Sequence, residues 1–200
     1  TEKRPILPKP CALRVCLLPF WTGMRVMHAL CPGVSARASE RAAWCLYDFA
    51  NSAFATIVVT FVYSVYFAKV VVGDETTGQA YWGWALTISA VAVALVSPIL
   101  GDYADRSAHK KHWLVGLALT SIVLTASLFW PVVPTGSVGA SDGWILWCWL
   151  AFVVANFAFE TMFVFYNAYL PGLGDPATLG RLSGKGWALG FAGGLLCLVL

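Results

Sequence analysis

The sequence is poor in charge. Asp, Glu, Lys and Arg make up 12% of its 200 residues, whereas soluble domains have about 25%. Two long stretches, 76–101 and 113–141, contain none of these four residues. Each exceeds the roughly 20 apolar residues that a helix needs to cross a bilayer. With 59% hydrophobic residues and a mean hydropathy of +0.72, the chain is predicted to be an integral membrane protein in contact with the lipid bilayer.

The chain also lacks the usual motifs of soluble catalytic and metal-binding proteins. Its six cysteines show no C-x-x-C spacing, and three lie in predicted spanning helices, so neither a disulfide framework nor a zinc site is expected. Gly180 to Gly186 has neither the spacing nor the Ser or Thr of a phosphate-binding loop, and H-E-x-x-H, G-x-S-x-G and G-x-G-x-x-G are absent. No enzymatic activity, cofactor or metal is therefore predicted, and the scattered basic residues do not indicate nucleic-acid binding.

The apolar segments predict an all-α membrane domain over residues 43–200. Its helices are expected at about 43–68, 81–100, 112–130, 144–166 and 186–200. The last has 15 residues, or about 22 Å of helix, which is shorter than the hydrocarbon core, so it is expected to be cut. Residues 1–42 are expected to be a basic, disordered tail, with an organelle transit peptide as the alternative; Met24 and Met27 are alternative starts, so 1–26 need not belong to the protein.

The basic residues are unevenly distributed over the predicted loops. Twelve of the 13 lie in the tail or in the loops 101–112 and 171–185, and Lys69 is the exception. Because cytoplasmic segments carry an excess of Lys and Arg, the amino terminus and both loops are predicted to be cytoplasmic.

The loop between the second and third predicted helices carries a recognisable pattern. Gly101, Asp105, Arg106 and Lys110 form Gly-x-x-x-Asp-Arg-x-x-x-Lys. This resembles the signature loop of the major facilitator superfamily, with Ala108 in place of the usual Gly. The resemblance implies a conformational latch held by Asp105 and Arg106. The alternative is a solvated charged loop that only follows the positive-inside rule.

Two further stretches narrow the resemblance to one family. The octapeptide 47–54, Tyr-Asp-Phe-Ala-Asn-Ser-Ala-Phe, and the segments 165–171 and 181–194 are similar to the autophagy-related vacuolar amino-acid effluxer and its bacterial relatives. The resemblance implies the amino-terminal part, about four and a half helices, of a twelve-helix major facilitator fold. Such a part is less than one half of the transporter and is not expected to transport alone.

The resemblance also implies a function. The whole protein is expected to be a secondary transporter that moves a small solute by alternating access, with amino acids as the first guess for the substrate and protons as a coupling ion. The membrane is expected to be the plasma (inner) membrane in a bacterium, and the vacuolar or another endomembrane in a eukaryote. A truncated transporter that no longer transports, and acts as a membrane interaction protein, is the alternative.

Polar residues inside the predicted helices are candidates for the transport pathway. Asp48, Asn51 and Ser52 share one face of the first helix, and Asn156 lies one turn from Glu160 in the fourth. Asp48, Asn51, Asn156 and Glu160 are predicted to line the substrate pathway or to couple protons, because intramembrane polar groups face protein or water. Capping and structural hydrogen bonding are the alternatives.

Three glycines mark a packing face on the last helix. Gly186, Gly190 and Gly194 follow one another at four-residue spacing. Such overlapping Gly-x-x-x-Gly steps predict close contact with another helix. In the interaction-protein alternative, this face binds a partner.

The orientation is testable by single-cysteine labelling on a cysteine-free background. A reagent that cannot cross the membrane should reach a cysteine at Ser137, on the predicted outer side, and not one at Ser107. Labelling of position 107 in intact cells would reverse the orientation derived from the basic residues.

Overall fold

The computed structural model describes residues 36–106, 109–129 and 139–200, and every regular element in these ranges is helical. Four helical segments in this part of the chain are long and apolar enough to cross a membrane: Ala38–Val72, Glu75–Ala104, Asp142–Leu173 and Ala177–Val199. The all-α membrane class predicted from the sequence is confirmed. Most of the tail predicted at 1–42 lies outside the described residues.

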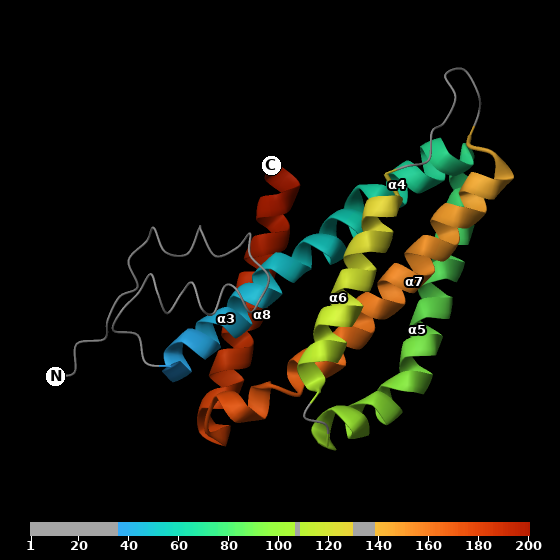
Figure 1. Ribbon diagram of the computed structural model, residues 1–200. Coiled ribbons are helices and arrows are strands. Elements are labelled where there is room, and N and C mark those ends of the chain that lie inside the picture. The colour runs from blue at the N-terminus through green and yellow to red at the C-terminus, as the bar shows by residue number, and fades with distance from the viewer. Residues whose placement is uncertain (1–35, 107–108, 130–138) are drawn as a thin grey trace. The chain divides into compact units, whose positions relative to one another are not determined.

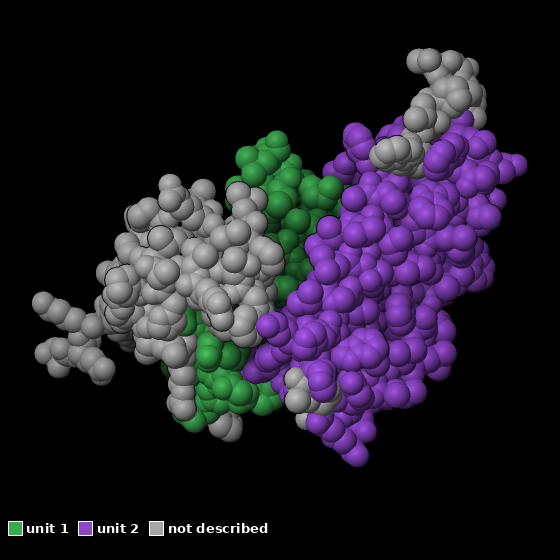
Figure 2. Space-filling view, viewed as in Figure 1, with its two compact units in different colours: residues 1–60, 171–200 green, residues 61–170 purple. Residues whose placement is uncertain are grey.

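The chain divides into two compact units (Figure 2). The first combines residues up to 60 with residues 171–200, and the second consists of residues 61–170. In the first unit the beginning and the end of the chain come together, since α3 (Ala36–Ala53) packs along α8 (Pro176–Val199) (Figure 1). This division was not predicted from the sequence, because both units are built from similarly apolar helices.

The first helical segment is longer than the predicted 43–68. After α3 it continues as the π-helical η1 (Phe54–Phe61), the short α4 (Tyr63–Tyr66) and the π-helical η2 (Phe67–Val72). Thr60 Oγ1 donates to the carbonyl oxygen of Ala55, five residues back, at 2.8 Å, which matches the wider π spacing. The segment ends at Gly73, whose φ of 80° is the left-handed conformation that glycine adopts without strain.

Helix α5 (Glu75–Arg106) exceeds the predicted 81–100 at both ends. At its start, the Thr77 amide donates to Asp74 Oδ2 at 2.8 Å, and hydrogen bonding from Thr77 holds the pKa of Asp74 below its usual range. At its end, the helix passes through Pro98 and includes residues 101–106, which were predicted to be loop. The charged residues there are compatible with helix because Asp102 and Arg106 pair across one turn at 2.7 Å.

Helix α7 (Asp142–Asn167) is the centre of the second unit and packs against both α5 and α6 (Lys110–Ser127) (Figure 1). On the α6 side, the rings of Trp113 and Phe165 stack with centroids 5.9 Å apart. On the α5 side, Trp82 stacks on Phe152 at 3.8 Å. Aromatic rings therefore hold α7 on both sides.

Helix α6 has fewer described residues than the predicted 112–130 and is not among the four candidate spans. Its first turn carries Lys110, Lys111 and His112, which lower its hydropathy. The predicted fourth helix, 144–166, agrees with α7 to within two residues.

The predicted start of the last helix, near Gly186, is wrong. A short 3₁₀ turn, η3 (Leu170–Leu173), leads into α8, which begins ten residues earlier at Pro176. Proline suits the first helical position because its missing N–H needs no partner there. With 24 residues, α8 is about 36 Å long, which is enough to cross the hydrocarbon core, whereas the 15 residues from Gly186 would be too short.

Candidate functional site

Helices α3 and α8 pack in parallel with a regular register. A methyl group on Gly186 would lie 2.5 Å from the Trp44 ring of α3. Gly190, one turn further along α8, lies against Asp48 and Ser52, and Gly194, after one more turn, lies against Ser52 and Thr56. Successive contacts are thus about four residues apart on both helices. Small residues at such a contact allow two membrane helices to pack closely.

The carboxylate of Asp48 lies in this interface, directly over Gly190. A Cβ added to Gly190 would lie 2.9 Å from Asp48 Oδ2 and 2.8 Å from Ser52 Oγ. Asp48 is only 8% exposed. Among the described residues, no Lys, Arg or His side chain forms an ion pair with it. The absent side chain of Gly190 therefore provides the space in which this carboxylate is buried.

The neighbouring hydroxyl groups do not donate hydrogen bonds to the carboxylate of Asp48. Ser52 Oγ donates to the carbonyl oxygen of Asp48 at 2.8 Å, and Thr56 Oγ1 donates to that of Ser52 at 3.0 Å. Each hydroxyl has one proton, and these bonds use it. The side-chain amide nitrogen of Asn51 is buried, with no hydrogen-bond partner in the part of the chain that the structure describes. Asp48, Asn51 and Ser52 are thus near one another on α3, as their spacing predicts.

Sequence reasoning missed Gly193. A Cβ at this position would overlap the backbone oxygen of Phe49, so here it is the main chain of α3 that approaches α8. The Gly193-Gly194 pair was the available signal, since two adjacent glycines allow a close approach over a wider part of the helix face. Arg41 was also missed: its Nε donates to the carbonyl oxygen of Leu173 at 2.6 Å and joins the start of α3 to the turn before α8.

The polar pair on α7, in the second unit, is divided between two environments. Asn156 is 5% exposed, whereas Glu160 is exposed on the surface of its unit. Glu160 lies 18 residues after the start of α7, or about 27 Å along a helix of about 39 Å. It is therefore within the membrane-spanning part, although its carboxylate is not packed inside its own unit.

The signature residues occupy the connection between α5 and α6. Arg106 pairs with Asp102, which the sequence analysis had not chosen, and both side chains are exposed. Lys110 Nζ lies 3.5 Å from the carbonyl oxygen of Ala168, just past the carboxyl end of α7, where a cation is favoured by the helix dipole. Gly101 lies within α5, where an added Cβ would be in ordinary contact with Val164 at 4.0 Å, and the side chain of Asp105 lies outside the described residues.

The chemical capacity of these sites follows from their charge. No group of three or more His, Cys, Asp or Glu that could hold a metal occurs in the described part of the chain. Asp48 and Glu160 each place a carboxylate in a spanning helix. A carboxylate in a medium of low polarity either takes up a proton or attracts a cation. The arrangement thus suits proton or cation exchange better than bond-breaking chemistry.

Comparison with known proteins shows the family of the chain. The family described as "Vacuole effluxer Atg22 like" matches residues 68–200, which include most of η2 and all of α5 to α8. The chain belongs to this family. The Atg22-like match covers both the signature residues and the glycines of α8, whereas Asp48 and Asn51 lie before it.

Two transporters show similarity to this Atg22-like chain. The uncharacterized MFS-type transporter YxiO of Bacillus subtilis is 28% identical over 160 residues, covering 78% of this chain and 35% of YxiO. Human monocarboxylate transporter 11 is 32% identical over 131 residues, covering 56% of this chain and 24% of the human protein. The chain thus spans about a third or less of the length of these relatives. No solved structure shows significant similarity to it.

The packing of the α8 glycines on α3 can be tested with control substitutions on the same helix. Gly190→Ala and Gly193→Ala should each destabilise the packing of α3 on α8 by about 1–3 kcal/mol, because an added methyl overpacks the interface. Gly193→Ala should cost more, since a backbone oxygen cannot turn away as a side chain can. Unfolding of the purified chain, followed by circular dichroism during titration with a denaturing detergent, measures the difference.

Gly180→Ala and Gly184→Ala are the matched controls, because nothing lies within 4 Å of a Cβ at either position. They should be neutral or slightly stabilising, since Ala favours helix over Gly. Ser52→Ala should recover part of the loss in Gly190→Ala by removing one of the obstructing atoms. Equal stability of the four glycine-to-alanine variants would contradict the close contact of α3 and α8.

Proposed function

We propose that this chain is part of a secondary transporter that moves a small solute across a membrane by alternating access. Membership of the Atg22-like family and similarity to two proteins named as transporters support a role in transport. Transport without chemical conversion of the solute is also consistent with carboxylates in spanning helices. In such proteins the substrate site lies between repeated bundles of helices.

The exposed carboxylate of Glu160 is the observation that carries the proposal. A charged side chain facing lipid near the middle of a bilayer costs several kcal/mol, so intramembrane acids face protein or a water-filled cavity. Glu160 is not covered within its own unit. Its face of α7 therefore lines a polar cavity in the proposed transporter, whereas Asn156, one turn away, is buried inside the unit and would line this cavity only in another access state.

We assign proton coupling to Asp48 and Glu160. Asp48 is buried over Gly190 without a cationic partner among the described residues, so its neutral form is favoured when the interface is closed. Contact with water would favour its charged form. A group whose protonation changes with access can link proton movement to the change between access states.

For the substrate, we propose a small solute that carries a carboxyl group, with amino acids first. The name of the human relative, a monocarboxylate transporter, supports the carboxyl group, and the resemblance to the vacuolar amino-acid effluxer favours amino acids as the first candidates. Amino acids and monocarboxylates share the carboxylate, which a site can recognise independently of the remaining structure.

Orientation and the signature residues complete the proposal. The connection between α5 and α6 lies in the cytoplasm, because it contains most of the basic residues near these helix ends. Asp105 and Arg106 act there as a latch between access states. Lys110, placed near the end of α7, would hold this connection against that helix in one state.

A membrane interaction protein is less well supported. That hypothesis used the glycine face of α8 to bind a partner helix. Within the first unit this face is already covered, since Trp44, Asp48 and Thr56 of α3 lie against its glycines. A partner would have to displace α3, and the close fit of the two helices opposes that.

Glu160→Gln tests the coupling role in the whole transporter that contains this chain. The substitution keeps the size of the side chain and removes its titration. Gradient-driven accumulation in proteoliposomes should be lost, while exchange of substrate across the membrane persists. Glu75→Gln, which removes an exposed carboxylate at the start of α5, is the matched control and should accumulate normally. Accumulation that survives with its pH dependence intact contradicts the coupling role.

Asp105→Asn tests the latch. Transport by the whole protein should fall about fivefold or more at equal expression, as expected for loss of a coupling of at least about 1 kcal/mol. Asp102→Asn is the control, because an exposed pair such as Asp102–Arg106 contributes about 0–1 kcal/mol. If both variants transport like the unaltered protein, the connection acts only as a topological signal.

A further inference from the structure

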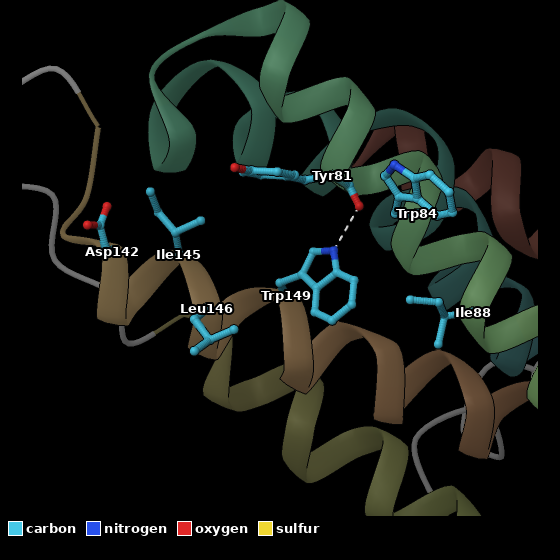
Figure 3. A pocket seen from close by; sticks show the side chains of 7 residues that line it. All are labelled: Tyr81, Trp84, Ile88, Asp142, Ile145, Leu146 and Trp149. Atoms are coloured by element: carbon cyan, nitrogen blue, oxygen red, sulfur yellow. Dashed lines mark hydrogen bonds between the residues drawn. The ribbon is translucent and has the colours of Figure 1, made fainter.

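A hollow at the amino ends of α5 and α7 is not used by the proposed transport mechanism. It has a volume of about 470 Å³ and is open to one side (Figure 3). This volume is within the range of small-molecule sites. The rings of Tyr81, Trp84 and Trp149 form part of its wall, Asp142 lies at its rim, Leu146 lies between Asp142 and these rings, and Ile88 lies beyond them. All these residues belong to the second unit.

The aromatic wall is held in place before any ligand binds. Trp149 Nε1 donates to the carbonyl oxygen of Tyr81 at 2.8 Å, which fixes the indole ring between the two helices. Trp82, which follows Tyr81 in α5, stacks on Phe152 of α7, and both rings are buried. A site with a rigid wall loses little conformational freedom when it binds a ligand.

The charge of the hollow selects a cation. Among the described residues that line it, Asp142 is the only ionisable acid or base apart from the tyrosine, and none is basic. Lys69, near the start of α5, pairs with Glu75 at 3.6 Å. The rings lie further along the helices than Asp142 and offer apolar surface to the chain of a ligand. An anion would meet a carboxylate here and no positive charge.

The dimensions select an amphiphile. From Asp142 to Trp149, and from Tyr81 to Ile88, the wall extends about 10 Å along each helix. The acidic end is at the helix start, and the apolar end lies further into the spanning segment. From these features we propose that the hollow binds an alkylammonium amphiphile of the membrane, with its cationic head near Asp142 and its chain along Leu146, the aromatic rings and Ile88.

A photoreactive dodecyltrimethylammonium, with a diazirine in its chain, tests the site on the purified chain in dodecyl maltoside micelles. Mass spectrometry of the peptides should locate the label between residues 81 and 88 and between 142 and 149. Unreactive dodecyltrimethylammonium should compete for the label. Dodecyl sulfate, which has the same chain and the opposite charge, should not.

Variants separate a site from general partition into the micelle. Asp142→Asn should weaken labelling about two- to fivefold by removing the charge, and Trp84→Leu about threefold to tenfold by removing a ring. Trp187→Leu is the matched control, because Trp187 on α8 is 67% exposed, close to the 63% of Trp84. It should label as the unaltered chain does, and circular dichroism checks that all variants are equally helical.

Three results would overturn the proposal. Labelling unchanged in both Asp142→Asn and Trp84→Leu would show partition without a site. Equal competition by dodecyl sulfate would show an apolar groove without preference for cations. Equal competition by tetramethylammonium, which lacks a chain, would show a site for soluble ammonium ions in place of an amphiphile.

Discussion

A helix in a bilayer has no water with which to satisfy its polar groups, so each must find a partner in the protein. Six hydroxyl groups in the described helices meet the requirement locally, whereas the buried Thr161 hydroxyl has no partner among the described residues. Ser52, Thr56, Thr87, Ser89, Thr120 and Thr125 each donate to the carbonyl oxygen four residues earlier in the same helix. Ser89 lies 3.2 Å from the carbonyl oxygen of Val153 as well, which joins α5 to α7. Polar residues can therefore occupy spanning helices without a separate binding site.

Carboxylates cannot use this solution, because an ionised carboxylate accepts hydrogen bonds and has no proton to donate to a carbonyl. Asp48 and Glu160 therefore differ in kind from the hydroxyl residues around them. Asp48 is enclosed where a glycine leaves room for it, and Glu160 is left on the surface of its unit. The two acids thus represent two ways of placing a titratable group in a membrane, and their difference in burial underlies the proposed function.

The same constraint explains the importance of the glycines. Two membrane helices gain little from the hydrophobic effect when they associate, so van der Waals contact and close approach of the backbones must stabilise the pair. Gly193 brings the backbones of α3 and α8 together, while Gly190 makes room for Asp48. The stability of this interface and the environment of the carboxylate are therefore coupled, and a substitution on this face of α8 changes both.

The membrane class, the presence and order of the helices, and the family could all be predicted from the residues alone. A bilayer selects long uncharged runs, and such runs are visible without a structure. Helix ends were predicted less well. Residues 101–106 extend α5 with an Asp102–Arg106 pair, and α8 begins at Pro176, because backbone hydrogen bonding continues a helix beyond its apolar part.

Only the folded structure showed which helix packs against each helix face. Four-residue spacing placed Asp48 and Ser52 on one face, and Gly186, Gly190 and Gly194 on another, but did not show that these faces pack together across more than a hundred residues of chain. It also could not separate buried Asn156 from exposed Glu160. Periodicity is a property of one helix, whereas burial depends on which other helix covers it, and that partner is chosen by packing between distant segments.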